Sequence, residues 1–128
     1  MSLSSTAFAR LNTAQRDAVA HGESRAGGGL LASPLLVIAG AGTGKTSTLA
    51  HRVARLLLAG VPPERMLLLT FTRRAALEMT RRAQKVMAEA LAAQAGPTSR
   101  VPENLRLPWS GTFHSIGNRL IREYAPRL

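Results

Sequence analysis

A glycine-rich stretch in the first half of the chain has the residue types and spacing of a phosphate-binding loop. It reads Ala39-Gly40-Ala41-Gly42-Thr43-Gly44-Lys45-Thr46. This fits the Walker A pattern G-x-x-x-x-G-K-[ST], with alanine in place of the first glycine. Glycine has no Cβ, so successive backbone N–H groups can turn inward around a phosphate. Lys45 can reach the β- and γ-phosphates as a point charge, and the Thr46 hydroxyl can ligate Mg²⁺.

The stretch therefore predicts a nucleotide site, with Lys45 and Thr46 as catalytic residues and Thr46 as the metal ligand. The predicted cofactor contacts of this loop are Ala39, Gly40, Ala41, Gly42, Thr43, Gly44, Lys45, Thr46 and Ser47. The motif by itself does not distinguish a kinase, a GTPase, a transporter ATPase or a motor.

Such a loop needs a strand before it and a helix after it. Residues 35–39 form a short apolar run with β-branched members, which is typical of a buried parallel strand. After the loop, apolar residues recur at helical spacing and predict a helix over 45–59, which Gly60 ends. The N-terminus of that helix would direct its dipole at the bound phosphate.

The rest of the chain alternates in the same way. The patterns predict further helices over 8–21, 73–93 and 115–124, strands over 66–71 and 109–113, and flexible loops over 22–33 and 94–108. In the helix over 73–93 we expect Ala76, Met79, Ala83, Val86 and Ala90 to face inward. Alternating strands and helices indicate an α/β fold, with a parallel sheet flanked by helices.

Composition and charge narrow the class of partner. The 128 residues carry 17 Lys and Arg against 7 Asp and Glu, a net charge of +10, so a polyanion is the expected partner. The alternative is a basic stretch balanced by acidic regions elsewhere. The chain has no cysteine, its histidines are scattered, and no apolar run approaches the roughly 18 residues of a membrane span. We expect a cytoplasmic protein without a membrane partner.

Three segments around the loop extend the pattern. Residues 11–16 read Leu-Asn-Thr-Ala-Gln-Arg, residues 69–76 read Leu-Thr-Phe-Thr-Arg-Arg-Ala-Ala, and residues 111–115 read Gly-Thr-Phe-His-Ser. Together with the loop, this set resembles the N-terminal motor domain (RecA-like, 1A) of superfamily 1 DNA helicases of the UvrD/Rep/PcrA type, from about residue 11 to 124. The resemblance implies a P-loop NTPase fold and ATP-dependent DNA unwinding with 3′-to-5′ polarity. It also implies a second RecA-like domain as a partner.

The resemblance assigns further roles by position. Gln15 matches the glutamine that reads adenine, although an exposed helical glutamine is the alternative. Relatives often carry a base where this chain has Ser47, and Asn-Lys where it has Arg73-Arg74. Core packing remains open for the phenylalanine at the strand end, as does a structural role for His114. The residues expected to contact single-stranded DNA are Thr70, Phe71, Thr72, Arg73, Arg74, His114 and Ser115.

The same comparison reveals what this sequence lacks. The acidic Walker B motif, the second motor domain and its arginine finger have no counterpart in residues 1–128. We therefore expect an incomplete N-terminal part of an ATP-binding domain that is inactive by itself. A helicase subunit of a helicase–nuclease, or a non-catalytic nucleic-acid-binding module, are the alternatives.

The missing Walker B strand affects the predicted sheet. In the resembled family this strand lies between the loop-bearing strand and the strand that ends at Phe71. Buried N–H and C=O groups need partners. We therefore expect residues 35–39 to pair directly with residues 66–70, or another chain to supply a strand.

Overall fold

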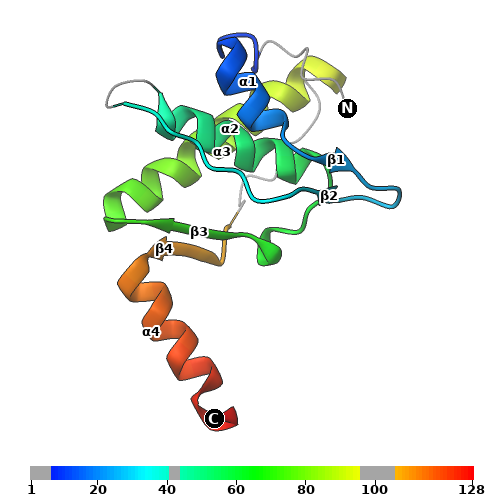
Figure 1. The fold of residues 1–128 in the computed structure, drawn as a ribbon. Coiled ribbons are helices and arrows are strands. Elements are labelled where there is room, and N and C mark those ends of the chain that lie inside the picture. Colours follow the sequence, from blue (N-terminus) through cyan, green and yellow to red (C-terminus); the bar gives the residue numbers. More distant parts are fainter. Residues whose placement is uncertain (1–6, 41–43, 96–105) are drawn as a thin grey trace.

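The computed structural model describes residues 7–40, 44–95 and 106–128 (Figure 1). Its elements, in chain order, are α1 (Thr13–Ala20), β1 (Glu23–Ser24), β2 (Leu30–Leu31), α2 (Lys45–Leu58), the 3-10 turn η1 (Pro63–Arg65), β3 (Leu67–Thr70), α3 (Arg73–Ala95), β4 (Trp109–Thr112), α4 (Phe113–Tyr124) and the 3-10 turn η2 (Ala125–Arg127). In Figure 1, α1, α2 and α3 lie above the β3–β4 pair, and α4 extends away from it.

Helix α1 begins at a reciprocal cap. The Gln15 backbone N–H donates to Asn12 Oδ1 at 2.9 Å, and the Asn12 N–H donates to Gln15 Oε1 at 2.9 Å. This capping box satisfies two N–H groups that the first helical turn would leave unpaired. The predicted helix over 8–21 is therefore shorter than expected, because residues 7–10 form a separate turn before the cap.

Helices α2 and α3 pack against each other and supply half of the buried hydrophobic residues described. The α3 positions predicted to face inward, Ala76, Met79, Ala83, Val86 and Ala90, are all buried. Val86 and Ala90 belong to an apolar cluster with Phe8 and Val19, and Met79 and Ala83 belong to a second one with Val53 and Leu68. On the outer side of α3, Arg82 pairs with Glu78 at 2.7 Å, and both side chains are about half-exposed. The helical periodicity of this segment was thus a correct guide to its buried face.

Strands β3 and β4 form a parallel pair. Leu67 lies opposite Trp109, and Thr70 lies opposite Thr112. Leu68 and Thr70 are buried, whereas Leu67 is 57% exposed, so the helices cover only one face of the pair at this strand. The parallel strands and their helices confirm the α/β class.

The predicted strand over 35–39 is wrong. These residues lie outside every helix and strand of the structure. Leu36 is 83% exposed and Ile38 is 89% exposed, so the run is not buried either. The predicted direct pairing with residues 66–70 is also wrong, because β3 takes β4 as its partner. The physical reason is that an apolar run becomes a buried strand only where a neighbouring strand accepts its N–H and C=O groups.

The segment 22–33, predicted as a flexible loop, contains a short antiparallel hairpin that the sequence did not predict. Glu23 lies opposite Leu31, and Ser24 lies opposite Leu30. The glycines between the strands have positive φ, a conformation that glycine adopts without steric cost. The Gly29 N–H donates to the Ala59 carbonyl at 2.9 Å, so the hairpin is held against the end of α2. In the second predicted loop, 94–108, residues 94–95 instead end α3, and residues 96–105 lie outside the described residues.

Helix α4 projects from the body of the molecule (Figure 1). Thr112 caps it, accepting the Ser115 N–H at 3.1 Å, and Ile116 is its buried residue. Ile121 is 68% exposed, so most of the apolar side of α4 faces solvent. The Arg119 guanidinium lies 3.8 Å from the Trp109 ring centroid and ties the helix to β4. Among the described helices, none is long and apolar enough to cross a membrane.

Candidate nucleotide and nucleic-acid site

The start of α2 is open to an anion. Gly44 is its N-cap residue, with φ 84° in the left-handed region that favours glycine. No side chain caps this end, and the first turn carries no acidic residue. A helix start without such partners leaves N–H groups free to bind a phosphate. These groups belong to Lys45, Thr46 and Ser47, whereas Ala41, Gly42 and Thr43 of the predicted loop lie outside the described residues.

Two cavities flank this helix start. The first, called here the Gln15 cavity, has a volume of about 410 Å³ and is lined by Gln15, Gly44 and Ser47 together with residues of α2, α3 and the N-terminal turn. The second, called here the Lys45 cavity, has a volume of about 360 Å³ and is lined by Lys45, Leu35 and Val37 among others. Gly44 lines the first cavity and Lys45 the second, so each cavity reaches the start of α2.

Gln15 lies against the end of the loop. A Cβ placed on Gly44 would fall 2.6 Å from Gln15 Nε2, closer than any real contact of this kind. The structure therefore brings Gln15 and Gly44 together. The capping box accounts for the position of Gln15, because its Oε1 accepts the Asn12 N–H.

The Gln15 cavity is rich in cations. Arg10, Arg82 and Lys85 line it together with one carboxylate, Glu89. Arg82 is already paired with Glu78, which offsets its charge. A cavity of this kind suits a ligand that combines a polar ring with negative charge.

Arg52 lines the Lys45 cavity and is held by two hydrogen bonds. Its NH1 donates to the Val19 carbonyl at 2.8 Å and also to the His21 carbonyl. Burial lowers the pKa of Arg52 below its usual range, and the positive charge of Arg55 lowers it further. Lys45 itself is exposed, as is Thr46, the predicted metal ligand. The described residues hold no group of three His, Cys, Asp or Glu side chains that could bind a metal by themselves.

The ends of β3 and β4 carry two exposed aromatic rings. Phe71 is 91% exposed and Phe113 is 50% exposed, so the alternative of core packing does not hold for Phe71. Their ring centroids lie 5.5 Å apart at an interplanar angle of 38°. Phe113 was not predicted as a site residue. The signal that could have found it is the repeated Thr-Phe pair at the end of each strand.

The hydroxyl groups beside these rings are engaged within the protein. Thr70 is 9% exposed, and its Oγ1 donates to the Thr72 carbonyl at 3.0 Å. Thr72 Oγ1 accepts the Ala75 N–H at 3.1 Å at the start of α3. These threonines therefore hold the strand ends and helix starts in place, while Arg73, Arg74 and His114 are exposed beside them.

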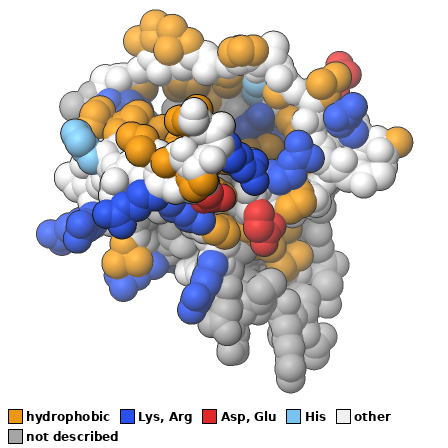
Figure 2. Space-filling view, turned by 90° about the horizontal axis from the view of Figure 1, so that it is seen from below, with side chains coloured by type: hydrophobic (Ala, Val, Ile, Leu, Met, Phe, Trp, Pro, Cys, Tyr) orange, Lys and Arg blue, Asp and Glu red, His pale blue; other side chains and the backbone are white. Residues whose placement is uncertain are grey.

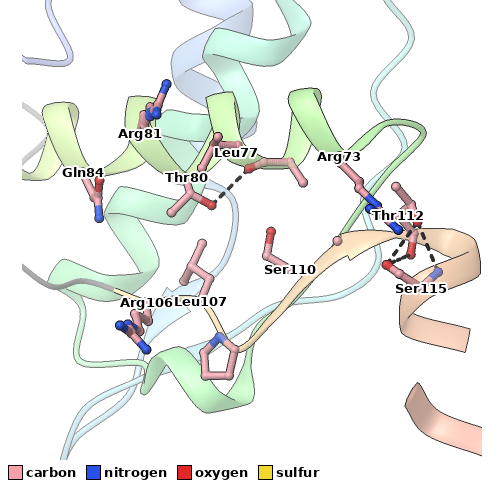
Figure 3. A pocket seen from close by; sticks show the side chains of 13 residues that line it. Arg73, Leu77, Thr80, Arg81, Gln84, Arg106, Leu107, Ser110, Thr112 and Ser115 are labelled. Atoms are coloured by element: carbon pink, nitrogen blue, oxygen red, sulfur yellow. Dashed lines mark hydrogen bonds between the residues drawn. The ribbon is translucent and has the colours of Figure 1, made fainter. Parts of the chain in front are cut away.

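A third cavity runs from this strand end along α3. It has a volume of about 610 Å³ and lies between α3 and β4, with Arg73 and Ser115 at one end and Arg106 at the other (Figure 3). In Figure 3 the Arg73 side chain extends toward Thr112 and Ser115. The Ser110 Oγ is buried without a hydrogen-bond partner. Figure 2 shows Lys and Arg side chains spread across one face of the molecule, with few acidic ones.

These features define an α/β protein with two candidate sites. In the first, the glycine-capped start of α2 lies beside the Gln15 carboxamide. In the second, basic and aromatic side chains gather at the ends of β3 and β4. Residues 11–128 match the protein family described as UvrD/REP helicase N-terminal domain. The chain belongs to this family.

Curated relatives agree with this assignment. The chain is 38% identical over 119 residues to the ATP-dependent DNA helicase PcrA of Staphylococcus aureus, a match that covers 92% of this chain and 13% of the relative. It is 39% identical over 116 residues to the ATP-dependent DNA helicase UvrD1 of Mycobacterium bovis, covering 90% of this chain and 12% of the relative. The same helicase of Mycobacterium tuberculosis matches equally well. The chain thus spans only about an eighth of the length of these relatives.

Proposed function

We propose that this chain is the ATP-binding part of an ATP-dependent DNA helicase that translocates 3′-to-5′ along a single strand. The observation that carries the proposal is the open start of α2, where Gly44 lies against Gln15 between two cavities. The family membership and the names of the relatives support ATP and DNA as the ligands. A second RecA-like domain would complete the ATP site and move against this one on hydrolysis.

In this proposal the nucleotide lies across the helix start. The N–H groups of Lys45, Thr46 and Ser47 and the Lys45 ammonium bind the phosphates. The adenine lies in the Gln15 cavity, where the Gln15 carboxamide offers a donor and an acceptor. Arg10, Arg82 and Lys85 of that cavity attract the negatively charged nucleotide, as the basic residue at the position of Ser47 does in relatives.

Mg²⁺ fits this site as a shared ligand. The exposed Thr46 hydroxyl offers one hard oxygen, and Mg²⁺ commonly takes its other ligands from phosphates and water. When bound, the ion would offset negative charge on the phosphates. The chain's own contribution is to hold the phosphates and that one oxygen.

DNA binds at the other site, the ends of β3 and β4. Phe71 and Phe113 stack on bases without regard to sequence. Arg73 and Arg74 attract backbone phosphates, and His114 and Ser115 border the same edge. Thr70 and Thr72 act by holding this edge in shape, since their hydroxyls are engaged within the protein.

Replacement of Lys45 tests the proposal. Lys45→Ala should weaken binding of Mg²⁺-ATP to this chain at least tenfold while leaving affinity for an oligothymidine unchanged. The expectation follows because Lys45 lines its own cavity and lies outside the aromatic edge. Arg65→Ala, which removes an exposed charge that lines neither cavity, is the matched control. Equal ATP affinity for Lys45→Ala and Arg65→Ala would refute the nucleotide assignment.

A further inference from the structure

The third cavity, called here the α3–β4 cavity, has a basic lining that the proposed function uses only at one end. Three arginines line it, Arg73, Arg81 and Arg106, and none of them forms an ion pair within the described part of the chain. None of the described residues that line the cavity is acidic. A cavity with unpaired cations and no carboxylate attracts a ligand that carries several negative charges.

Ser110 places an unused hydrogen-bonding group in the same cavity. It lines the cavity from β4, and its Oγ is buried without a partner among the described residues. In Figure 3 this oxygen points from β4 toward α3. A buried hydroxyl without a partner is unfavourable, and a ligand that accepts its hydrogen bond removes that penalty. The oxygens of a sugar–phosphate backbone are such acceptors.

The floor of the cavity is held in place by the core and by α4. Leu107 is 8% exposed and belongs to the apolar cluster that includes Leu68. The Ser110 N–H donates to the Leu107 carbonyl at 3.2 Å. Arg119 of α4 donates through NH1 to the Pro108 carbonyl. A fixed segment therefore presents the Ser110 hydroxyl, so a ligand would bind without first ordering it.

The cavity is continuous with the proposed DNA site. Arg73 and Ser115 line it, and both also border the aromatic edge, which is the pair of exposed rings at the ends of β3 and β4. From Arg73 the lining follows α3 to Gln84, and the eleven positions between them correspond to about 16 Å. A single strand spans at least about 3.4 Å per nucleotide, so up to about five nucleotides fit along this length.

We propose that the α3–β4 cavity is a second subsite for single-stranded nucleic acid, in which the Ser110 hydroxyl and the Arg106 guanidinium bind the sugar–phosphate backbone beyond the aromatic edge. Arg73 lies where the two subsites meet. Both groups donate hydrogen bonds to oxygen atoms that every nucleotide carries, so binding here depends on strand length and salt but not on base sequence. This subsite extends, and so rests on, the DNA function proposed for the aromatic edge.

The length dependence of strand binding tests the subsite. An oligothymidine of about four nucleotides can occupy the aromatic edge alone, whereas one of about twelve can also enter the cavity. By fluorescence anisotropy at low salt, we expect Arg106→Ala to weaken binding of the longer strand about threefold to tenfold and that of the shorter strand less than about twofold. For the longer strand, the slope of log affinity against log salt should also fall by about 0.7, the contribution of one phosphate contact. Arg65→Ala, which removes an exposed arginine that lines none of the three cavities, is the matched control.

Ser110→Ala separates ligand binding from a structural role. The hydroxyl has no partner in the described structure, so its loss should leave the midpoint of thermal unfolding unchanged or raise it. The longer strand should nevertheless bind about twofold to fivefold more weakly, and the shorter strand equally well. The proposal is overturned if the double variant Arg106→Ala, Ser110→Ala binds the longer strand as well as Arg65→Ala does. A loss that is equal for both strand lengths would overturn it too.

Nuclear magnetic resonance shows what enters the cavity. The backbone signals of Leu107, Ser110 and Gly111 should shift with the longer oligothymidine and not with the shorter one. Equal shifts with inorganic phosphate at the same phosphate concentration would indicate a site for free anions. Equal shifts with a polyglutamate of the same charge would indicate a surface for acidic peptides. Either result would refute the assignment of the cavity to a nucleic-acid strand.

Failure of this subsite and failure of the proposed DNA function give different results. If both strands bind and depend on Phe71 but not on Arg106 or Ser110, the aromatic edge stands and the subsite is refuted. If the longer strand binds through Arg106 and Ser110 without dependence on Phe71, the subsite stands and the role of the aromatic edge is refuted. If neither strand binds, both assignments are refuted.

Discussion

Phe71→Ala should separate strand binding from stability. The ring is 91% exposed, so its removal exposes almost no new core, and the free energy of unfolding should change by less than about 0.5 kcal/mol. A base stacked on an aromatic ring contributes roughly 1–3 kcal/mol. Phe113 is half-exposed and remains beside the site, so the loss should lie in the lower part of this range. We expect affinity for an oligothymidine to fall about 5- to 30-fold, which corresponds to roughly 1–2 kcal/mol.

Fluorescence anisotropy of a labelled oligothymidine, with thermal unfolding of each variant, measures both quantities. Phe113→Ala and the double variant complete a cycle, in which we expect a coupling of about 0.5–1.5 kcal/mol because the rings lie in contact. Ile121→Ala, which removes an exposed apolar side chain from α4, is the control. The stacking argument is refuted if Phe71→Ala and Ile121→Ala bind the strand equally well, or if Phe71→Ala unfolds at a much lower temperature.

Three further outcomes follow. Strand affinity should fall about fifty-fold between 50 and 200 mM salt if about four phosphates are neutralised, and a salt titration without a slope would contradict a phosphate-dominated mode. The pure chain should hold nucleotide but not hydrolyse it, since no acidic motif positions the attacking water; sustained phosphate release that depends on Lys45 would disprove this. Val19→Ala should lower the free energy of unfolding by about 2 kcal/mol, because Val19 is fully buried between the N-terminal turn, α2 and α3. A loss below about 0.5 kcal/mol, measured by urea unfolding, would contradict that packing.

The helices were largely predictable because their signals are local. The apolar spacing along α3 identified all five predicted buried positions. The polar residue Asn12 caps the start of α1, and Gly60, which has a positive φ, follows the end of α2. The strands near residues 66–71 and 109–113 were also found, since each is a short run between turn residues. These features depend on residues within a few positions of one another.

The wrong predictions concern pairing between distant segments. The apolar run over 35–39 has the composition of a strand, but composition does not say whether a neighbouring strand is available. The glycines between Glu23 and Leu31 indicate a loop, but they do not indicate the pairing of Glu23 with Leu31 or the hydrogen bond from Gly29 to Ala59, which is 30 positions away.

The candidate site follows the same division. The helix start at Gly44 and the basic and aromatic strand ends could be predicted, because each lies within one motif. Neither the contact of Gln15 with Gly44 nor the cavity between α3 and β4 has a local signal, because each joins two separate segments.

The exposed apolar run beside the loop bears on how the molecule behaves at high concentration. Leu36 and Ile38 offer a second copy exposed side chains on a segment that lies in no strand of the described structure, and such a segment can associate edge to edge. The net charge of +10 opposes that encounter, because like charges keep copies apart. Polyanions neutralise this charge and salt screens it, so both remove the barrier while leaving the apolar run uncovered. We therefore expect polyanions and high salt to favour self-association through residues 35–38, which light scattering of the chain at increasing salt would detect.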